Sequence, residues 1–423
     1  MKSGFFYSIG LSRMTFSSNV IPILTILVLS VLTITPLLSY KIILMALWGA
    51  FFIFENNKFH RINGKLRSVL TLGVLYVFIC VVYKLLDVSS ANMGYCAVLP
   101  FFYFVPVLAL IIIDKCQNEQ QIRFLFHFVS LAAAINIADN IRLYNIYGAD
   151  IVFQNLAGLL EEEGITGINL GGAMFVNMTV FYACLMFLAF LKSNKVLEKI
   201  LFLTYVSIGA YFIIICSLKA SAIVLMLISF VSMYISVKSK KHVVANLMLM
   251  AVIGVVVSFF MDSIIHFLIG VIGSQRVASR LIIFTSEADI SDSGSLMSRS
   301  ELWLVSIKTW LSGVGSFFFG IGDHRWDDFM TTADSGIGNH SDFLDILARY
   351  GILGGLVFYS SIKVYYDYLK KRCGTNFKYE ILSFFILVLL MGFTKKIIGT
   401  QPAVMIFILF PLTLKYFSYR ESL

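Results

Sequence analysis

Long runs of apolar residues recur along most of this chain, and short polar links separate them. Runs of this length predict α-helices that cross a lipid bilayer, where helices satisfy every backbone polar group internally. We count twelve runs, at residues 20–38, 42–54, 69–86, 98–113, 124–138, 171–191, 200–216, 221–237, 243–260, 352–369, 381–394 and 400–416. The pattern therefore predicts an all-α polytopic membrane protein that forms a single integral membrane domain over residues 1–423.

Two links are much longer than the others. The first, residues 139–170, is acidic and contains several glycines. The second, residues 261–351, follows the ninth run and carries most of the polar residues that are suited to chemistry. We expect this large loop to contain short helices and the functional site.

Composition agrees with a membrane protein and excludes an ordinary soluble globule. Of 423 residues, 59% are hydrophobic and 13% are charged, whereas soluble domains carry about 25% charged residues. The six cysteines are scattered along the chain and have no spacing typical of a metal site or a disulfide framework. We therefore expect no metal and no cofactor.

The net charge of +9 invites a nucleic-acid interpretation, but the distribution of the charges argues against it. Most of the 33 Lys and Arg residues lie in the links on one side of the predicted spans, and most of the 24 acidic residues lie in the links on the other side. Lys and Arg are enriched in cytoplasmic links of membrane proteins. The pattern therefore predicts cytoplasmic N- and C-termini and a loop 261–351 outside the cytoplasm. No small-residue cleavage site follows the first run, so we expect this span to be retained as an anchor.

The interiors of the predicted spans contain almost no charge. Lys363 is an exception, and it lies near enough to one end of its run to extend its ammonium group toward the membrane surface. Ion-coupled transporters usually place charged residues within their spans. The sequence therefore disfavours a coupled transporter.

Within the large loop, Ser298-x-x-Glu301 has the spacing of a capping box and predicts a helix that begins at Arg299. On this helix Arg299, Trp303, Ser306 and Trp310 share one face. Such a face is typical of an interfacial helix with aromatic anchors. Arg299 then either pairs with a lipid phosphate or holds a substrate diphosphate, for which the planar guanidinium is well suited.

A second helix is predicted from an N-cap at Asn339 to Gly351, with His340 in its first turn. The positive end of a helix disfavours the imidazolium, so His340 is expected to stay neutral and to be available as a general base, with Asp342 nearby to orient it. The alternative is a solvent-facing loop histidine. Gly320-x-Gly322 and Gly336-x-Gly338 predict tight turns that fold the loop back over the membrane.

These residues resemble a known signature. His340-Ser341, nine residues and then Gly351-Ile352-Leu353-Gly354 resemble the H-[NSQ]-x9-G-x-x-[GTY] motif of the bacterial O-antigen polymerase (Wzy) and O-antigen ligase superfamily. Arg299-x3-Trp303 followed by Gly320-Ile321-Gly322 is similar to the other half of that family's periplasmic domain. The resemblance covers about residues 200–360.

The resemblance implies a GT-C-like, metal-independent glycosyltransferase of the bacterial inner membrane in lipopolysaccharide O-antigen biosynthesis. Its partners would be an undecaprenyl-diphosphate-linked oligosaccharide and membrane lipid, with a chain-length regulator protein as a further candidate and no nucleic acid. His340 and Arg299 would be catalytic. Arg276, Arg280 and Lys219 would bind the diphosphate, although ligases often carry Arg near the place of Lys219.

Three functions follow as alternatives. An O-antigen polymerase would extend one lipid-linked glycan with another, whereas an O-antigen ligase would transfer the glycan to lipid A–core. The third, from a different class, is a polysaccharide flippase or transporter. We prefer the polymerase among the three.

Overall fold

The computed structural model describes residues 63–86, 100–147 without 102 and 117, and 173–238 without 218 and 219. It also describes isolated positions between 244 and 253, residues 299–322, residue 337, and residues 341–421 without 396. All regular elements in these ranges are helical. The all-α part of the fold prediction is therefore confirmed, and the membrane-spanning length of eight helical segments, described below, confirms the coarse prediction of a polytopic membrane protein.

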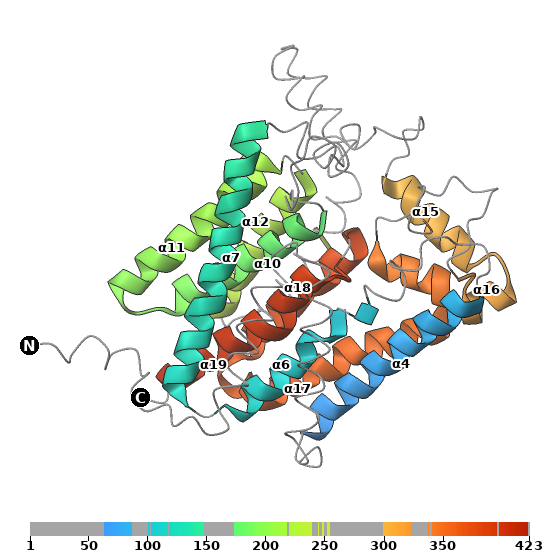
Figure 1. The fold of residues 1–423 in the computed structure, drawn as a ribbon, viewed down its shortest axis with the longest axis horizontal. Helices are drawn as coiled ribbons and strands as arrows, with labels where there is room; N and C mark the ends of the chain where they lie inside the picture. The colour runs from blue at the N-terminus through green and yellow to red at the C-terminus, as the bar shows by residue number, and fades with distance from the viewer. Residues whose placement is uncertain are drawn as a thin grey trace, which may run out of the picture.

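The elements follow the chain in one series (Figure 1). They are α4 (Gly64–Leu86), α6 (Pro106–Lys115), α7 (Glu119–Tyr147), α10 (Ala173–Lys192), α11 (Val196–Tyr211) with the π-helical η3 (Phe212–Cys216), α12 (Ala220–Lys238), α15 (Arg299–Trp310), α16 (Val314–Phe319), α17 (Asp342–Thr394), α18 (Thr400–Val404), η5 (Met405–Leu409) and α19 (Phe410–Glu421).

Eight helical segments within the described ranges are long and apolar enough to cross a membrane. They match eight of the twelve predicted runs, including the fifth, which is one continuous 29-residue helix, α7, despite Asn136 and Asp139. The run at 98–113 overlaps the ten-residue α6, which begins with Pro106 and ends at Lys115. The runs at 20–38 and 42–54 and nearly all of 243–260 lie outside the described residues, so a total of twelve stays a prediction.

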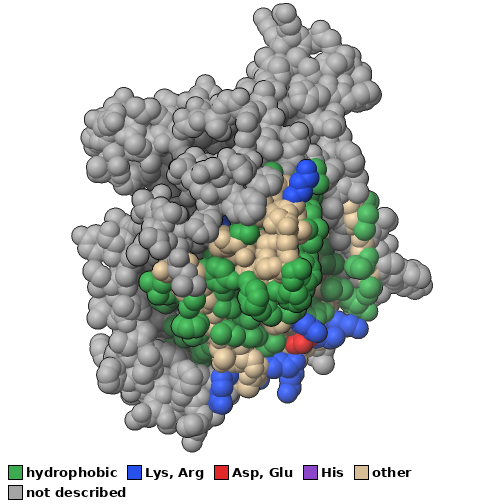
Figure 2. Space-filling view, turned by 90° about the vertical axis from the view of Figure 1, so that its right-hand side faces the viewer, with side chains coloured by type: hydrophobic (Ala, Val, Ile, Leu, Met, Phe, Trp, Pro, Cys, Tyr) green, Lys and Arg blue, Asp and Glu red, His purple; other side chains and the backbone are tan. Residues whose placement is uncertain are grey.

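Burial separates central from peripheral spans. The segment Thr400–Tyr419 is 83% buried over its most apolar window and Met174–Lys192 is 78% buried, whereas Gly64–Tyr83 in α4 is only 28% buried. Figure 2 shows the face that carries α4, where hydrophobic side chains form a band and Lys and Arg side chains gather along its lower edge. This arrangement is typical of a surface that faces lipid tails and ends at the headgroups.

α17 is a helical hairpin with two interruptions. Its backbone leaves helical geometry at Gly351 (φ 62°, ψ −168°) and at Phe377 (φ −123°, ψ 22°). The rings of Phe343 and Phe393 lie 5.1 Å apart, and those of Tyr366 and Phe385 also lie 5.1 Å apart, so the two arms run antiparallel. The predicted end of a helix at Gly351 is confirmed by the positive φ of this glycine, and a second helical segment begins directly after it.

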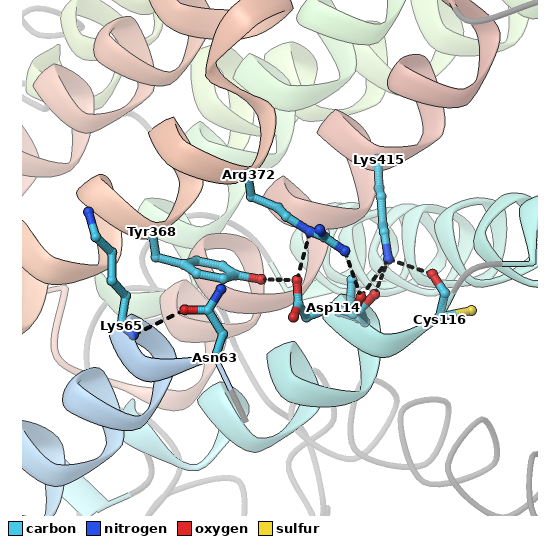
Figure 3. Close-up of polar contacts among 8 residues, drawn as sticks. Asn63, Lys65, Asp114, Cys116, Tyr368, Arg372 and Lys415 are labelled. Carbon is cyan, nitrogen blue, oxygen red and sulfur yellow. Dashed lines mark hydrogen bonds and ion pairs between the residues drawn. The ribbon is translucent and has the colours of Figure 1, made fainter. Parts of the chain in front are cut away.

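Polar contacts join several helices at one end of the bundle (Figure 3). Asp114, near the end of α6, accepts a hydrogen bond from Tyr368 Oη (2.7 Å) and pairs with Arg372 Nε (3.0 Å). Lys415 Nζ of α19 donates to the backbone oxygens of Ile113, Asp114 and Cys116, and so satisfies carbonyls that the end of α6 leaves free.

Two further contacts join residues from this same group of links. Lys65 Nζ donates to the backbone oxygen of Asp367 (3.1 Å), and Lys192 pairs with Glu380 (2.9 Å). All the residues in these contacts come from, or directly border, links that the charge pattern assigned to one side of the membrane. The fold thus keeps those links together at one end of the bundle and leaves α15 and α16 for the other (Figure 1).

Candidate functional site at the α15–α17 junction

The candidate site is built where the turn after α16 meets the bend in α17. Gly320 (φ 76°) and Gly351 (φ 62°) both occupy the left-handed region that favours glycine. A Cβ atom on Gly320 would overlap the carbonyl group of Arg349, and one on Gly351 would overlap the carbonyl group of Phe318. The two backbones therefore approach each other so closely that neither position has room for a side chain.

Hydrogen bonds fix this approach. The amide of Ile321 donates to the oxygen of Ala348 (3.0 Å), and the amide of Gly322 donates to the oxygen of Arg349 (2.8 Å). The turn after α16 thereby satisfies carbonyls that the bend at Gly351 removes from the helical pattern of α17. The predicted tight turn at Gly320-x-Gly322 is confirmed, with positive φ at both glycines.

α15 packs along the same part of α17. Ser306, which is 1% exposed, donates its hydroxyl to Asp345 Oδ1 (2.6 Å), and Asp345 is 4% exposed. A second, apolar contact lies beside this bond, where Val305, Ala348 and Ile337 form a small buried cluster. A buried hydrogen bond to a carboxylate is among the stronger kinds in proteins.

The aromatic anchors predicted on α15 have a different role. α15 does begin at Arg299, as the capping-box spacing predicts. However, Trp310 donates its indole N–H to the backbone oxygen of Phe317 (3.0 Å) and stacks on the Phe317 ring, with centroids 5.2 Å apart. The face with Ser306 and Trp310 thus packs on protein, because α16 and α17 cover it, and the prediction of an interfacial face is wrong there.

The start of α17 also differs from the prediction. Its N-cap is Ser341, not Asn339, and the Ser341 hydroxyl accepts a hydrogen bond from the amide of Leu344 (3.2 Å). The helix begins at Asp342, so His340 precedes the N-cap and is not in the first turn. Asp342 and Asp345 both lie in that first turn and bring negative charge, so the helix dipole no longer supplies a reason for a neutral imidazole.

Asp342 holds the chain that connects the second arm of α17 to α18. Its Oδ2 accepts hydrogen bonds from the backbone amides of Ile397 and Ile398, the latter at 2.6 Å. The amide of Asp342 donates to the oxygen of Lys395 (3.3 Å). Asp342 therefore fixes the connection at 395–398 beside the N-cap. Its predicted role of orienting His340 involves a residue outside the described part of the chain and stays a prediction.

Two tyrosines of α4 pack against this junction. The buried Tyr76 of α4 packs edge-on against Tyr350, with ring centroids 5.8 Å apart, and Tyr83 packs against the same ring at 5.4 Å. Tyr83 also donates its hydroxyl to the backbone oxygen of Phe319. α4 thus supports both the end of α16 and the bend in α17.

Most of the predicted site residues fall outside the residues that the structure describes. These are His340, Arg276, Arg280 and Lys219, together with the side chain of Arg299 and the pair Gly336-x-Gly338. The structure does describe the backbone next to them: helix α15, which starts at Arg299, and Ser341, which follows His340 in the chain. The Ser306–Asp345 bond was not predicted, although two acids and an arginine at positions 342, 345 and 349 of an apolar helix are a signal for it.

Comparison with protein families and with curated proteins finds no match.

Proposed function

We propose that the chain is an O-antigen polymerase of the bacterial inner membrane, which transfers an undecaprenyl-diphosphate-linked glycan onto another lipid-linked repeat unit. One observation supports this most. The two segments that carry the resemblance are separated in sequence, yet the described part of each packs on the other through Gly320 and Gly351 and through Ser306 and Asp345. A shared site requires this proximity.

The proposed chemistry is a single displacement. His340 would accept the proton of the acceptor hydroxyl while that oxygen attacks the anomeric carbon of the donor glycan. The bond between this carbon and the diphosphate oxygen breaks, and undecaprenyl diphosphate leaves with the electron pair. An imidazole with the reference pKa of about 6.5 is mostly neutral above pH 7, so a general base needs no special shift here.

The leaving diphosphate gains negative charge as its bond to the sugar breaks. Arg299 would bind it with two parallel N–H groups, and Arg276, Arg280 and Lys219 would add positive charge. These residues lie in segments that the charge pattern assigns to the outer side of the membrane. In this proposal both termini are cytoplasmic and the site faces the periplasm.

The glycan profile of a deletion strain tests the proposal against its alternatives. Loss of a polymerase should leave a single repeat unit on lipid A–core. Long lipid-linked chains with unmodified core would instead indicate a ligase. Repeat units that accumulate on the cytoplasmic side would indicate a flippase, and either of these results would contradict the proposal.

A further inference from the structure

The α15–α16 segment has an exposed apolar edge on the side that faces away from α17. Leu304 is 47% exposed and Leu311 is 57% exposed, and they lie seven positions apart on one stripe of α15. α16 continues this edge with Val314, which is 77% exposed, and with the half-exposed Phe318 and Phe319. The opposite side of α15, with Val305, Ser306 and Thr309, is buried.

We infer that this edge, made of Leu304, Lys308, Leu311, Val314, Phe318 and Phe319 and here called the α16 edge, rests in the headgroup layer of the membrane. Neither helix can cross a bilayer, since α15 has 12 residues and α16 has six. A short amphipathic helix with one apolar side instead lies in the plane of the interface.

The height of this edge relative to the bilayer follows from α4. Tyr83, near the end of α4, donates its hydroxyl to the backbone oxygen of Phe319. Val74 and Phe78 of the same helix are 68% and 61% exposed, and Leu85 is 70% exposed. The lipid-facing surface of α4 thus extends to the level of Phe319. The α16 edge continues this surface at the boundary between the hydrocarbon core and the headgroups.

Charge favours lipid over a protein partner. Lys308 is exposed and lies four positions after Leu304, between the two leucines of the stripe. A lysine in this place can lay its alkyl stem along apolar surface and extend its ammonium group to lipid phosphates. In a contact with a second copy of the chain, the same ammonium would be buried within an apolar stripe, which is costly without a matching carboxylate.

A photo-crosslinker at the edge tests this inference on the full-length chain. Phe318→p-benzoylphenylalanine, reconstituted in vesicles of phosphatidylethanolamine and phosphatidylglycerol, should give phospholipid adducts on irradiation. The matched control is the same replacement of Phe317, whose ring stacks on Trp310 and which should give adducts within the chain. Cross-links from position 318 to a second copy, or an absence of lipid adducts there, would overturn the inference.

The charge argument has its own test in the same vesicles. Lys308→Glu should lower the yield of lipid adducts from position 318 by at least about fivefold in vesicles that contain phosphatidylglycerol. One basic residue near an anionic surface contributes about 1 kcal/mol, and the added negative charge acts in the same direction. Lys308→Arg should keep the yield. An unchanged yield with Lys308→Glu would contradict a role for anionic headgroups. Neither readout depends on glycan transfer, so failure here leaves the proposed function to be judged separately.

Discussion

Gly320 and Gly351 lie in two backbone segments that are in direct contact, and both have a positive φ. The position that a side chain of either glycine would take is occupied by the backbone of the other segment. This contact joins the end of α16 to the bend of α17. It therefore fixes the position of α16, and of the preceding α15, relative to the first part of α17.

Replacing either glycine should disrupt the junction. Gly351→Ala or Gly320→Ala forces a side chain into left-handed backbone, which costs about 1–2 kcal/mol, and also overpacks the contact by about 1–3 kcal/mol. We expect a large loss of thermal stability or of folded protein in detergent. Gly315→Ala is the matched control on α16, because a Cβ atom there meets nothing within 4 Å. Equal stability of all three variants would refute the close contact.

The Ser306–Asp345 hydrogen bond should stabilise the packing of α15 on α17. Ser306→Ala should lower the free energy of unfolding by about 1.5–3 kcal/mol, because a buried carboxylate loses a donor. In a double-mutant cycle with Asp345→Asn, we expect a coupling of about 0.5–3 kcal/mol, measured by thermal unfolding. Ser68→Ala, at an exposed serine that bonds only within α4, should change little. Strict additivity of the two changes would show that they do not interact.

The orientation of the bundle can be measured with reporter fusions. Fusions after Lys195, Lys240 and Lys371 should report the cytoplasm, because the basic links lie there. Fusions within residues 280–340 should report the periplasm. A cytoplasmic signal from 280–340 would place the proposed site in the wrong compartment and remove the mechanism.

Arg299 is expected to act through its planar guanidinium. Arg299→Lys keeps the positive charge but loses the paired N–H groups, so glycan transfer should fall. Arg299→Ala should raise the barrier by about 2–4 kcal/mol if this residue is a main electrostatic stabiliser of the leaving group. The readout is the length of glycan on lipid A–core at equal protein level. Normal glycan from both variants would mean that Arg299 only contacts lipid.

Local sequence signals predicted local features of the junction well. The Ser298-x-x-Glu301 spacing located the start of α15, and the glycines at 320, 322 and 351 do take positive φ. Tertiary contacts were not encoded in such spacing. Asn339 and Ser341 are both good N-cap residues, and the choice of Ser341 accompanies its bond to the Gly392 oxygen of the neighbouring arm.

The same limit explains the error at Trp310. A tryptophan on an amphipathic helix near a membrane fits an interfacial anchor and a packed core contact equally well by periodicity. Only the three-dimensional position of Phe317 decides between them. Likewise, the sequence predicts the helix end at Gly351. It does not predict the close contact of this glycine with Phe318, because that contact depends on the position of the turn after α16.

Proton transfer by His340 is the central step of the proposed function, and replacement of this residue tests it most directly. General-base catalysis contributes about 10²–10⁴-fold to rate. His340→Ala should therefore abolish long glycan at unchanged protein level, while His340→Gln, which can hydrogen-bond the acceptor but cannot take its proton, should restore little. His242→Ala, in a link that the charge pattern assigns to the cytoplasm, serves as the control and should leave the glycan profile unchanged. Wild-type chain length from both His340 variants at equal expression would contradict the account.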